Sequence, residues 1–462
     1  MDNLWLLTEE RPKASVVLQI IEMYCNDFND RIIQHDEIRI KPHINDGYFE
    51  FIYEVEGLAV NNADKIYLKT VSGYSSFLDF LLFKQQEAPL ENDYTANPIM
   101  GIEETKTSDD ESRNTGVSQR VSKFVYFQHF YPNVKMYMLY NEELDAREDK
   151  KPSNTSIFGT NILLSLGVTI LGKDTSRWFS PFNNVDELIA FKSRMRRPPA
   201  GNIPIKITKI GNTIEVSGRL DKPAGKGNIA HDPSIGSLSM IGAGLRVLGW
   251  DGDIVITCHG VLQEYINKNR NNKFLFNCSI LRMHLLGLTL PNISLPDHYW
   301  HYEKNSEKMA DILLHIQTTY HGMSCIYENH AGCERGYFKP KTGDPVTLPK
   351  KDRSGINLYL PDVVLYDEAT NFVLLVEGKM LSTLQLGLTE IENYDSIEQE
   401  YIFPSYGRVQ IKRCVSIFGG NCIHIPHEKV LFYLADDGKI IINANAPLCI
   451  RRTFAGTGVS YD

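Results

Sequence analysis

The sequence lacks long apolar runs, closely paired cysteines and the features of a secretory signal. No apolar run approaches the roughly 20 residues that a membrane-spanning helix needs. The chain has 8 cysteines, none of them in a Cys-x-x-Cys pair, so we expect no disulfide framework and a reducing compartment. The first residues, MDNLWLLTEERPK, contain no apolar signal core. These absences predict a cytoplasmic protein with no membrane association.

Positive charge is also scarce. With 48 basic and 57 acidic residues, the net charge of −9 argues against a protein that coats nucleic acid through bulk electrostatics. It does not exclude an enzyme that contacts DNA locally. Two stretches, 188–214 and 265–296, contain basic residues and no acid. They are candidate DNA-contacting regions, and the alternative is an ordinary solvated surface.

The common nucleotide-binding motifs are missing as well. The glycine-rich segment 225–236 contains neither a Walker-type Gly-Lys-Ser/Thr sequence nor the Rossmann glycine spacing. Such a loop can place backbone N–H groups against a phosphate, but a structural turn explains the glycines equally well.

The chain does contain one pattern that occurs twice, at 77–106 and at 359–379. Each copy reads as an apolar strand with an acid near its start, a turn, and a second strand that ends in acid-any-lysine. A helical pattern and a further strand follow each copy, so the order of elements recurs. The residues that define the pattern are Asp79, Glu104 and Lys106 in the first copy, and Asp362, Glu377 and Lys379 in the second.

This pattern suits a metal ion beside a phosphate. Side chains alternate along a strand, so an acid and a lysine two residues later share one face. Mg²⁺ prefers oxygen ligands and needs few carboxylates, and beside a phosphodiester it supports hydrolysis. The lysine orients or deprotonates the attacking water. We therefore expect Mg²⁺ as cofactor, with metal ligands Asp79, Glu104, Asp362 and Glu377. The alternative is that these acids form surface ion pairs, or that one copy is degenerate.

The second copy, Pro361-Asp362 followed by Glu377-Gly378-Lys379, resembles the PD-(D/E)XK nuclease superfamily, and the segment 103–120 is similar to type II restriction endonucleases. The first copy departs from the family pattern because Leu78 replaces the proline and its loop is longer. The resemblance implies Mg²⁺-dependent, sequence-specific cleavage of double-stranded DNA and a companion DNA methyltransferase. It also implies an additional acid on the helix before each copy, for which Glu22 and Glu307 are the candidates.

We expect an α/β protein with two restriction-endonuclease-like units, each a mixed sheet flanked by helices. The expected division is a nuclease-like unit at 1–145, a DNA-recognition region at 146–290 and a PD-(D/E)XK domain at 291–462, acting as a monomer or homodimer. Candidate DNA-binding residues are Arg113, Asn114, Arg120, Arg194, Arg196 and Arg197.

Two other functions compete with a restriction enzyme: a structure-selective nuclease of repair or recombination, and a DNA-binding protein with a decayed nuclease fold. The retained lysines argue against the second. A separate possibility is a zinc site in the segment 321–333, whose spacing matches no common zinc finger. Its candidate ligands are His321, Cys325, His330 and Cys333.

Overall fold

The computed structural model describes most of the chain. The described residues are 1–9, 11–73, 78–90, 95–105, 115–141, 151–195, 206–219, 241–242, 244–259, 302–303, 307–329, 336–348 and 358–462. They form two compact units. The terminal unit comprises Met1–Ser72, Lys84–Ala88 and Glu303–Asp462, and the central unit comprises Gly73–Phe83 and Pro89–Tyr302. Both units combine helices with parallel and antiparallel strands, which confirms the predicted α/β class.

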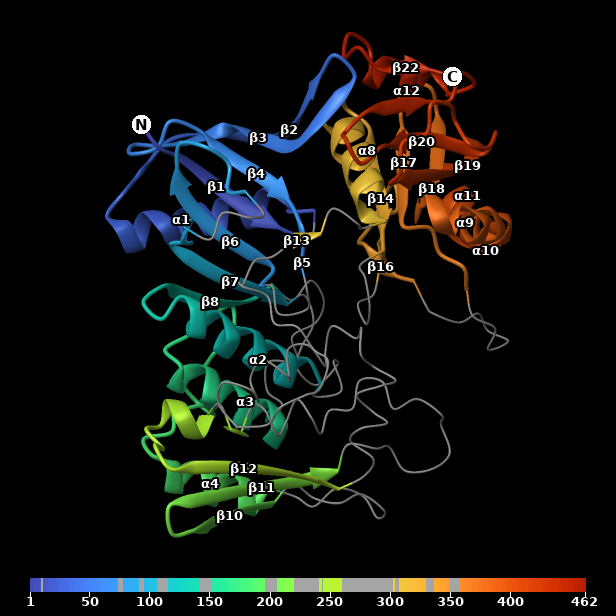
Figure 1. Cartoon of the computed structure of the whole chain (residues 1–462). Coiled ribbons are helices and arrows are strands. Elements are labelled where there is room, and N and C mark those ends of the chain that lie inside the picture. The colour runs from blue at the N-terminus through green and yellow to red at the C-terminus, as the bar shows by residue number, and fades with distance from the viewer. Residues whose placement is uncertain are drawn as a thin grey trace. The chain divides into compact units, whose positions relative to one another are not determined.

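The first part of the terminal unit contributes four neighbouring strands of a larger sheet and one helix. The parallel pair β1 (Asn3–Thr8) and β4 (Ile66–Thr70) is extended by β3 (Tyr48–Val60), which is antiparallel to β4, and then by β2 (Ile32–Asn45). Helix α1 (Ala14–Phe28) connects β1 to β2 (Figure 1).

Strand β3 shows why this sheet forms. Phe49, Phe51, Tyr53 and Val55 are buried, and the residues between them are exposed or half-buried. This period-two alternation is typical of a strand with one face on a hydrophobic core and the other toward solvent.

The second part of the terminal unit is a nine-stranded sheet in the order β16-β15-β14-β17-β18-β19-β20-β21-β22. Its strands are β14 (Ser324–Glu328), β15 (Tyr337–Phe338), β16 (Val346–Thr347), β17 (Val363–Asp367), β18 (Phe372–Met380), β19 (Gln410–Phe418), β20 (Val430–Leu434), β21 (Ile440–Ile442) and β22 (Ser460–Tyr461). Its helices are α8 (Lys308–Tyr320), α9 (Leu384–Glu390), α10 (Asp395–Ile397), α11 (Phe403–Tyr406) and α12 (Leu448–Thr453), with the short turns η2 (Leu381–Thr383), η3 (Ile391–Asn393) and η4 (Glu398–Ile402).

The middle strands of this sheet are covered on both faces. All of β17 and seven consecutive residues of β18 are buried, a pattern typical of strands with helices on both sides. Helix α8 packs on one face, and the segment α9–α11 packs on the other (Figure 1). Ile391, Tyr394 and Ile397 from that segment join the core formed with β17, β18 and β19.

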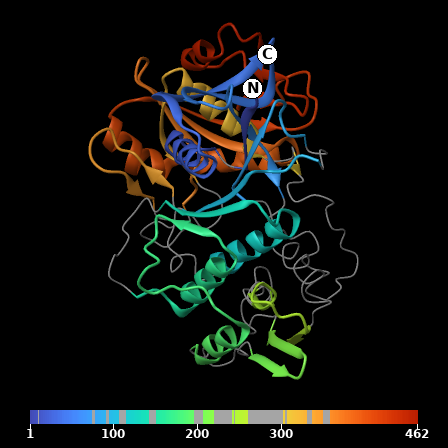
Figure 2. The same ribbon diagram turned by 90° about the vertical axis from the view of Figure 1, so that its left-hand side faces the viewer.

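The central unit contains a second ladder of strands. Its members are β6 (Phe80–Gln85), β7 (Met100–Thr105), β8 (Lys135–Tyr140) and β9 (Thr169–Leu171). Its helices are α2 (Thr115–Phe130), α3 (Asn154–Ser165) and α4 (Val185–Arg194), and a separate small sheet is formed by β10 (Lys206–Ile210), β11 (Thr213–Arg219) and β12 (Asp253–His259) (Figure 2). Two short strands, β5 (Ser72–Gly73) and β13 (Tyr302–Glu303), lie where the chain passes from one unit to the other.

The two ladders have the same topology. In the central unit β6 is antiparallel to β7, which is parallel to β8, which is parallel to β9. In the terminal unit β17 is antiparallel to β18, which is parallel to β19, which is parallel to β20. A helical segment joins the second strand to the third in both. The repeated order of elements predicted from the sequence is therefore present in the fold.

Some predicted boundaries differ from the structure. Apolar residues recur at helical spacing over 14–34 and predict a helix there, but α1 ends at Phe28, because Asn29 adopts the left-handed conformation (φ 51°) that commonly ends helices, and the chain then enters β2. Strand β1 was not predicted, since its six residues are too few to show a clear period. The predicted division at 145 and 290 remains a prediction.

None of the described helices combines the length and the apolar character that a membrane-spanning helix requires.

A backbone contact between the two parts of the terminal unit yields a stability prediction. At the far end of the β2–β3 hairpin, Phe49 N–H donates to Gly438 O in the β20–β21 turn (2.8 Å). Gly438 has a φ of +90°, and a Cβ added there would lie 2.1 Å from Phe49 O. We expect Gly438→Ala to lower the free energy of unfolding by about 3 kcal/mol or more in urea denaturation, because the clash is with backbone.

Gly343 is the matched control, with a φ of +99° and nothing within 4 Å of an added Cβ. Gly343→Ala should cost only the strain of a left-handed alanine, roughly 1–2 kcal/mol. If the free energy of unfolding falls equally in the two variants, the contact with Phe49 is not important for stability.

Candidate functional site

The acid before β17 and the acid within β18 lie opposite each other. Val363 pairs with Val376, so the next antiparallel position brings Asp362 opposite Glu377. The N–H of Gly378 donates to Asp362 Oδ2 (2.9 Å), which fixes this carboxylate beside β18. The register therefore brings together the two carboxylates that the sequence predicted as metal ligands.

Lys379 shares the face of Glu377 and lies between two acids. Its Nζ donates to Glu377 Oε1 and lies 2.8 Å from Glu390 Oε2. The hydroxyl of Tyr394 donates to the other oxygen of Glu377. Glu390 and Tyr394 come from the helical segment after β18. Neither residue is among the site residues predicted from the sequence, because both lie outside the two strands of the motif.

Gly387 leaves room for the lysine. A Cβ added at this position of α9 would lie 2.7 Å from Lys379 Cγ. The absence of a side chain at Gly387 therefore lets the stem of Lys379 pass beneath the helix toward Glu390.

A third acid, Asp311, reaches this cluster from α8, in addition to the predicted Glu307. A Cβ added at Gly378 would lie 3.0 Å from Asp311 Cγ, so the carboxyl group of Asp311 lies directly against the Gly378 backbone. Glu307 is exposed at the N-cap of α8, one turn earlier, and makes no side-chain capping bond. Burial and, more weakly, repulsion from Glu307 raise the pKa of Asp362, so Glu307 acts on the cluster from its edge. Asp311 stands out as the one acid within the apolar segment 309–316.

The cluster holds more negative charge than its own lysine balances. Burial, followed by repulsion from Asp362, raises the pKa of Glu377 to about 8. The same two causes raise the pKa of Asp311 well above its usual range. Burial opposes the charge on Lys379, but Glu377 and Glu390 outweigh it and raise the pKa of this lysine, which stays protonated. Such an excess of carboxylates favours the binding of a further cation.

The central unit repeats this arrangement with a shift of one residue. Phe80 pairs with Ile102, so Asp79 lies opposite Glu103, not opposite the predicted Glu104. The N–H of Glu104 donates to Asp79 Oδ2 (2.7 Å), as the N–H of Gly378 does to Asp362. Glu103 therefore has the position in β7 that Glu377 has in β18.

The side chain of Glu104 points to the other face of β7, because side chains alternate along a strand. Its Oε1 accepts a hydrogen bond from Asn141 Nδ2 (2.9 Å). Glu104 thus contacts the cluster through its backbone N–H, whereas the sequence predicted that its carboxylate would bind the metal.

A lysine from helix α2 completes the central cluster. Lys123 Nζ donates to both carboxylate oxygens of Glu103 (2.8 and 2.9 Å) and lies 3.6 Å from Asp79 Oδ1. It makes the contact with Glu103 that Lys379 makes with Glu377. Burial, followed by repulsion from Asp79, raises the pKa of Glu103 to about 8, again as for Glu377. The predicted lysine, Lys106, lies outside the described residues.

The candidate DNA-binding residues divide into three groups. Arg120 is buried in α2, and its Nη2 donates to Thr105 Oγ1 (2.8 Å) at the end of β7. Arg194 is exposed at the end of α4, where its Nε donates to Ala190 O (3.1 Å). The others lie outside the described residues: Arg113, Asn114, Arg196 and Arg197.

The remaining candidates lie as follows. Glu22 is exposed on α1. In the possible zinc segment, His321 is the C-cap of α8 and Cys325 lies in β14, while His330 and Cys333 lie outside the described residues, as does the glycine-rich segment 225–236.

Comparisons with protein-family models, with curated proteins and with solved structures find no match to this chain. The functional argument therefore rests on the geometry of the two acidic clusters.

The raised pKa of Asp311 yields a stability prediction. A carboxyl group whose pKa rises on folding binds more protons in the folded state, so its contribution to stability falls as pH rises above the ordinary value of 3.8. Asp311→Asn removes the carboxylate and therefore this loss of stability at high pH. In metal-free urea denaturation we expect the variant to be more stable than the parent at pH 8, with the difference shrinking toward pH 4.

Asp367→Asn is the control, because Asp367 is a buried acid with a cationic partner, Arg452, whose Nη2 lies 2.8 Å from Oδ1. Removal of this charge should destabilise the protein at pH 8. A loss of stability in Asp311→Asn at pH 8 would contradict the electrostatic description of the cluster.

Proposed function

We propose that the chain is a Mg²⁺-dependent endonuclease that cleaves double-stranded DNA at a specific sequence, as a type II restriction endonuclease of PD-(D/E)XK type. The observation that carries the proposal is the convergence of Asp311, Asp362 and Glu377 around Lys379, repeated in the central unit by Asp79, Glu103 and Lys123. Incubation with phage DNA and Mg²⁺, with and without EDTA, tests it. Discrete fragments that require Mg²⁺ support the proposal, and intact DNA in both samples contradicts it.

The residues fit Mg²⁺. Hard divalent cations prefer oxygen ligands, and each cluster offers carboxylates whose pKa is raised by burial and by repulsion from a neighbouring aspartate. Asp311, Asp362 and Glu377 would hold the ion in the terminal unit, and Asp79 and Glu103 in the central unit. Bound Mg²⁺ supplies a Lewis acid that lowers the pKa of water and neutralises phosphate charge.

The lysines provide a second positive charge. Lys379 remains protonated because Glu377 and Glu390 raise its pKa, so we assign it the role of a hydrogen-bond donor and cation at the phosphate rather than that of a base. Tyr394 and Glu390 hold the carboxylate and the lysine in place. Lys123 has the same role beside Glu103.

Two clusters suit an enzyme that cuts two strands. A restriction enzyme must hydrolyse one phosphodiester in each strand, and a chain with two clusters can use one for each. The net charge of −9 requires that DNA contacts be local, and Arg120 beside Thr105 and Arg194 at the end of α4 remain candidates. Such an enzyme would act beside a DNA methyltransferase that protects the host sequence.

The two-cluster proposal predicts strand-selective nicking. Lys379→Met and Lys123→Met keep an unbranched side chain, one atom shorter, and remove its charge. Each should slow cleavage of one strand by roughly 100- to 1,000-fold, the usual loss for one transition-state donor, and the two variants should spare opposite strands. Conversion of supercoiled plasmid to open circle, with the nick mapped by primer extension, measures this.

Lys341→Met is the control, because Lys341 forms an exposed ion pair with Glu368 (3.6 Å) and should leave linearisation unchanged. Lys106→Met tests the assignment of the central lysine. Full cleavage of both strands by Lys379→Met or Lys123→Met would overturn the two-cluster proposal. If Lys106→Met nicks the plasmid and Lys123→Met does not, the cation of the central cluster is Lys106 rather than Lys123.

The affinity for Mg²⁺ should rise with pH. Glu377 and Glu103 each have a pKa raised to about 8, and a protonated carboxyl group must lose its proton before it binds a cation. Below pH 8 we expect the affinity to increase by up to about tenfold per pH unit for each proton displaced. Calorimetric titration of Mg²⁺ between pH 6 and pH 9 measures this. An affinity that does not change between pH 6 and pH 8 would contradict the assignment of these glutamates as ligands.

A further inference from the structure

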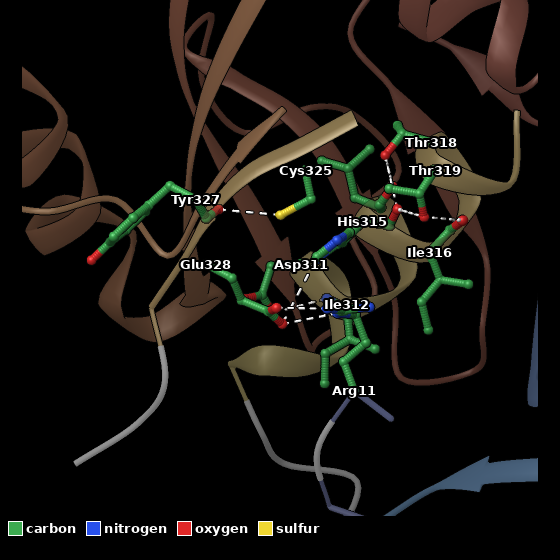
Figure 3. A network of polar contacts seen from close by, with 11 residues as sticks. Arg11, Asp311, Ile312, His315, Ile316, Thr318, Thr319, Cys325, Tyr327 and Glu328 are labelled. Carbon is green, nitrogen blue, oxygen red and sulfur yellow. Dashed lines mark hydrogen bonds and ion pairs between the residues drawn. The ribbon is translucent and has the colours of Figure 1, made fainter. Parts of the chain in front are cut away.

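A separate group of potential ligands lies between α8 and β14. Nitrogen, sulfur and oxygen atoms of His315, Cys325 and Glu328 all lie within 4.8 Å of one another. Figure 3 shows these three side chains close together, with Cys325 Sγ donating to Tyr327 O (3.3 Å) and Arg11 beside Glu328. The proposed nuclease uses none of them.

A β-bulge brings two of these side chains to one face. Residues three apart on a regular strand point to opposite faces. The pairing of β14 with β17 shifts between Cys325 and Tyr327, so that Cys325 lies opposite Leu365 and Glu328 lies opposite Val363. Leu365 and Val363 share a face of β17, and therefore Cys325 and Glu328 share a face of β14. Bulges of this kind often re-aim side chains at functional sites.

Helix α8 supplies the third ligand. His315 is 2% exposed, and its Nδ1 lies 3.9 Å from Glu328 Oε1. It follows Asp311 by four residues, about one helical turn, so the same face of α8 serves this group and the acidic cluster. The histidine is held by the packing of α8 on the sheet, as a preorganised ligand would be.

Arg11 orients the carboxylate. Its Nε donates to Glu328 Oε1 (2.9 Å) and its Nη2 to Oε2 (2.6 Å). A carboxylate oxygen has two lone pairs, so Glu328 can keep a bond to the guanidinium and still bind a cation. Metal-binding carboxylates usually have such a supporting hydrogen bond.

We propose that His315, Cys325 and Glu328 form a binding site for a borderline-soft transition-metal ion of the Zn²⁺ class. An imidazole, a thiolate and a carboxylate suit Zn²⁺ or Co²⁺, whereas Mg²⁺ prefers oxygen ligands alone. Three protein ligands leave a fourth position for water. The chain thus has one kind of site for Mg²⁺ and another for a softer metal.

The site would join three segments that are distant in the sequence: the loop carrying Arg11, helix α8 and strand β14. Binding to the folded protein alone would stabilise the terminal unit by mass action. It would also fix α8, which carries Asp311 into the acidic cluster. The inference does not depend on the nuclease proposal, because none of the ligands belongs to that cluster.

Titration of the metal-free full chain with Co²⁺ tests the proposal. We expect one Co²⁺ per chain to produce a thiolate-to-cobalt charge-transfer band and the intense visible bands of four-coordinate cobalt, and Zn²⁺ to abolish both. Cys325→Ser should remove the charge-transfer band, and His315→Gln should weaken binding at least tenfold. Absence of a thiolate band in the parent protein would overturn the proposal.

Cys422→Ser is the matched control, since Cys422 and Cys325 are both free cysteines of intermediate exposure. It should bind Co²⁺ as the parent does. A thiolate band that survives Cys325→Ser, or that disappears in Cys422→Ser, would overturn the assignment. Asp362→Asn separates the two proposals: it should reduce Mg²⁺-dependent double-strand cleavage to nicking of one strand and leave the cobalt spectrum unchanged.

Discussion

The antiparallel register between two short strands is the constraint on which both acidic clusters depend. In each unit an acid just before one strand lies opposite a glutamate in the next, and the N–H after that glutamate holds the first acid in place. Buried carboxylates repel one another because little water screens their charges. Such a pair therefore destabilises the fold when no cation is bound. The ladder hydrogen bonds and the buried apolar residues of β17 and β18 offset this cost and keep the acids together.

Much of the fold could be predicted from local patterns. The alternation in β3, the apolar runs of β17 and β18 and the periodicity of α8 each indicate their element directly. The sequence could not show that the first 72 residues and the last 160 belong to one unit. That association depends on contacts such as Phe49 with Gly438 and Arg11 with Glu328, and no local pattern marks them.

The candidate site shows the same limit at the level of single residues. The terminal cluster was predictable because Asp362, Glu377 and Lys379 all belong to two adjacent strands. In the central unit the sequence favoured Glu104, but register placed Glu103 opposite Asp79, and a slip of one residue reverses every side chain of a strand. Lys123, Glu390, Tyr394 and Asp311 come from helices, whose packing decides which residue of a turn reaches the sheet.

The discontinuity of the terminal unit has a consequence for how the protein is made. Ribosomal synthesis proceeds from the N-terminus, and domains generally fold as units when their residues have emerged. Most of the central unit, Pro89–Tyr302, emerges before the C-terminal portion of the terminal unit. Strands β1 to β4 must therefore wait for Glu303–Asp462, and the cluster around Lys379 assembles only after the central unit has left the ribosome. Translation products that end before Tyr394 thus carry no complete terminal cluster.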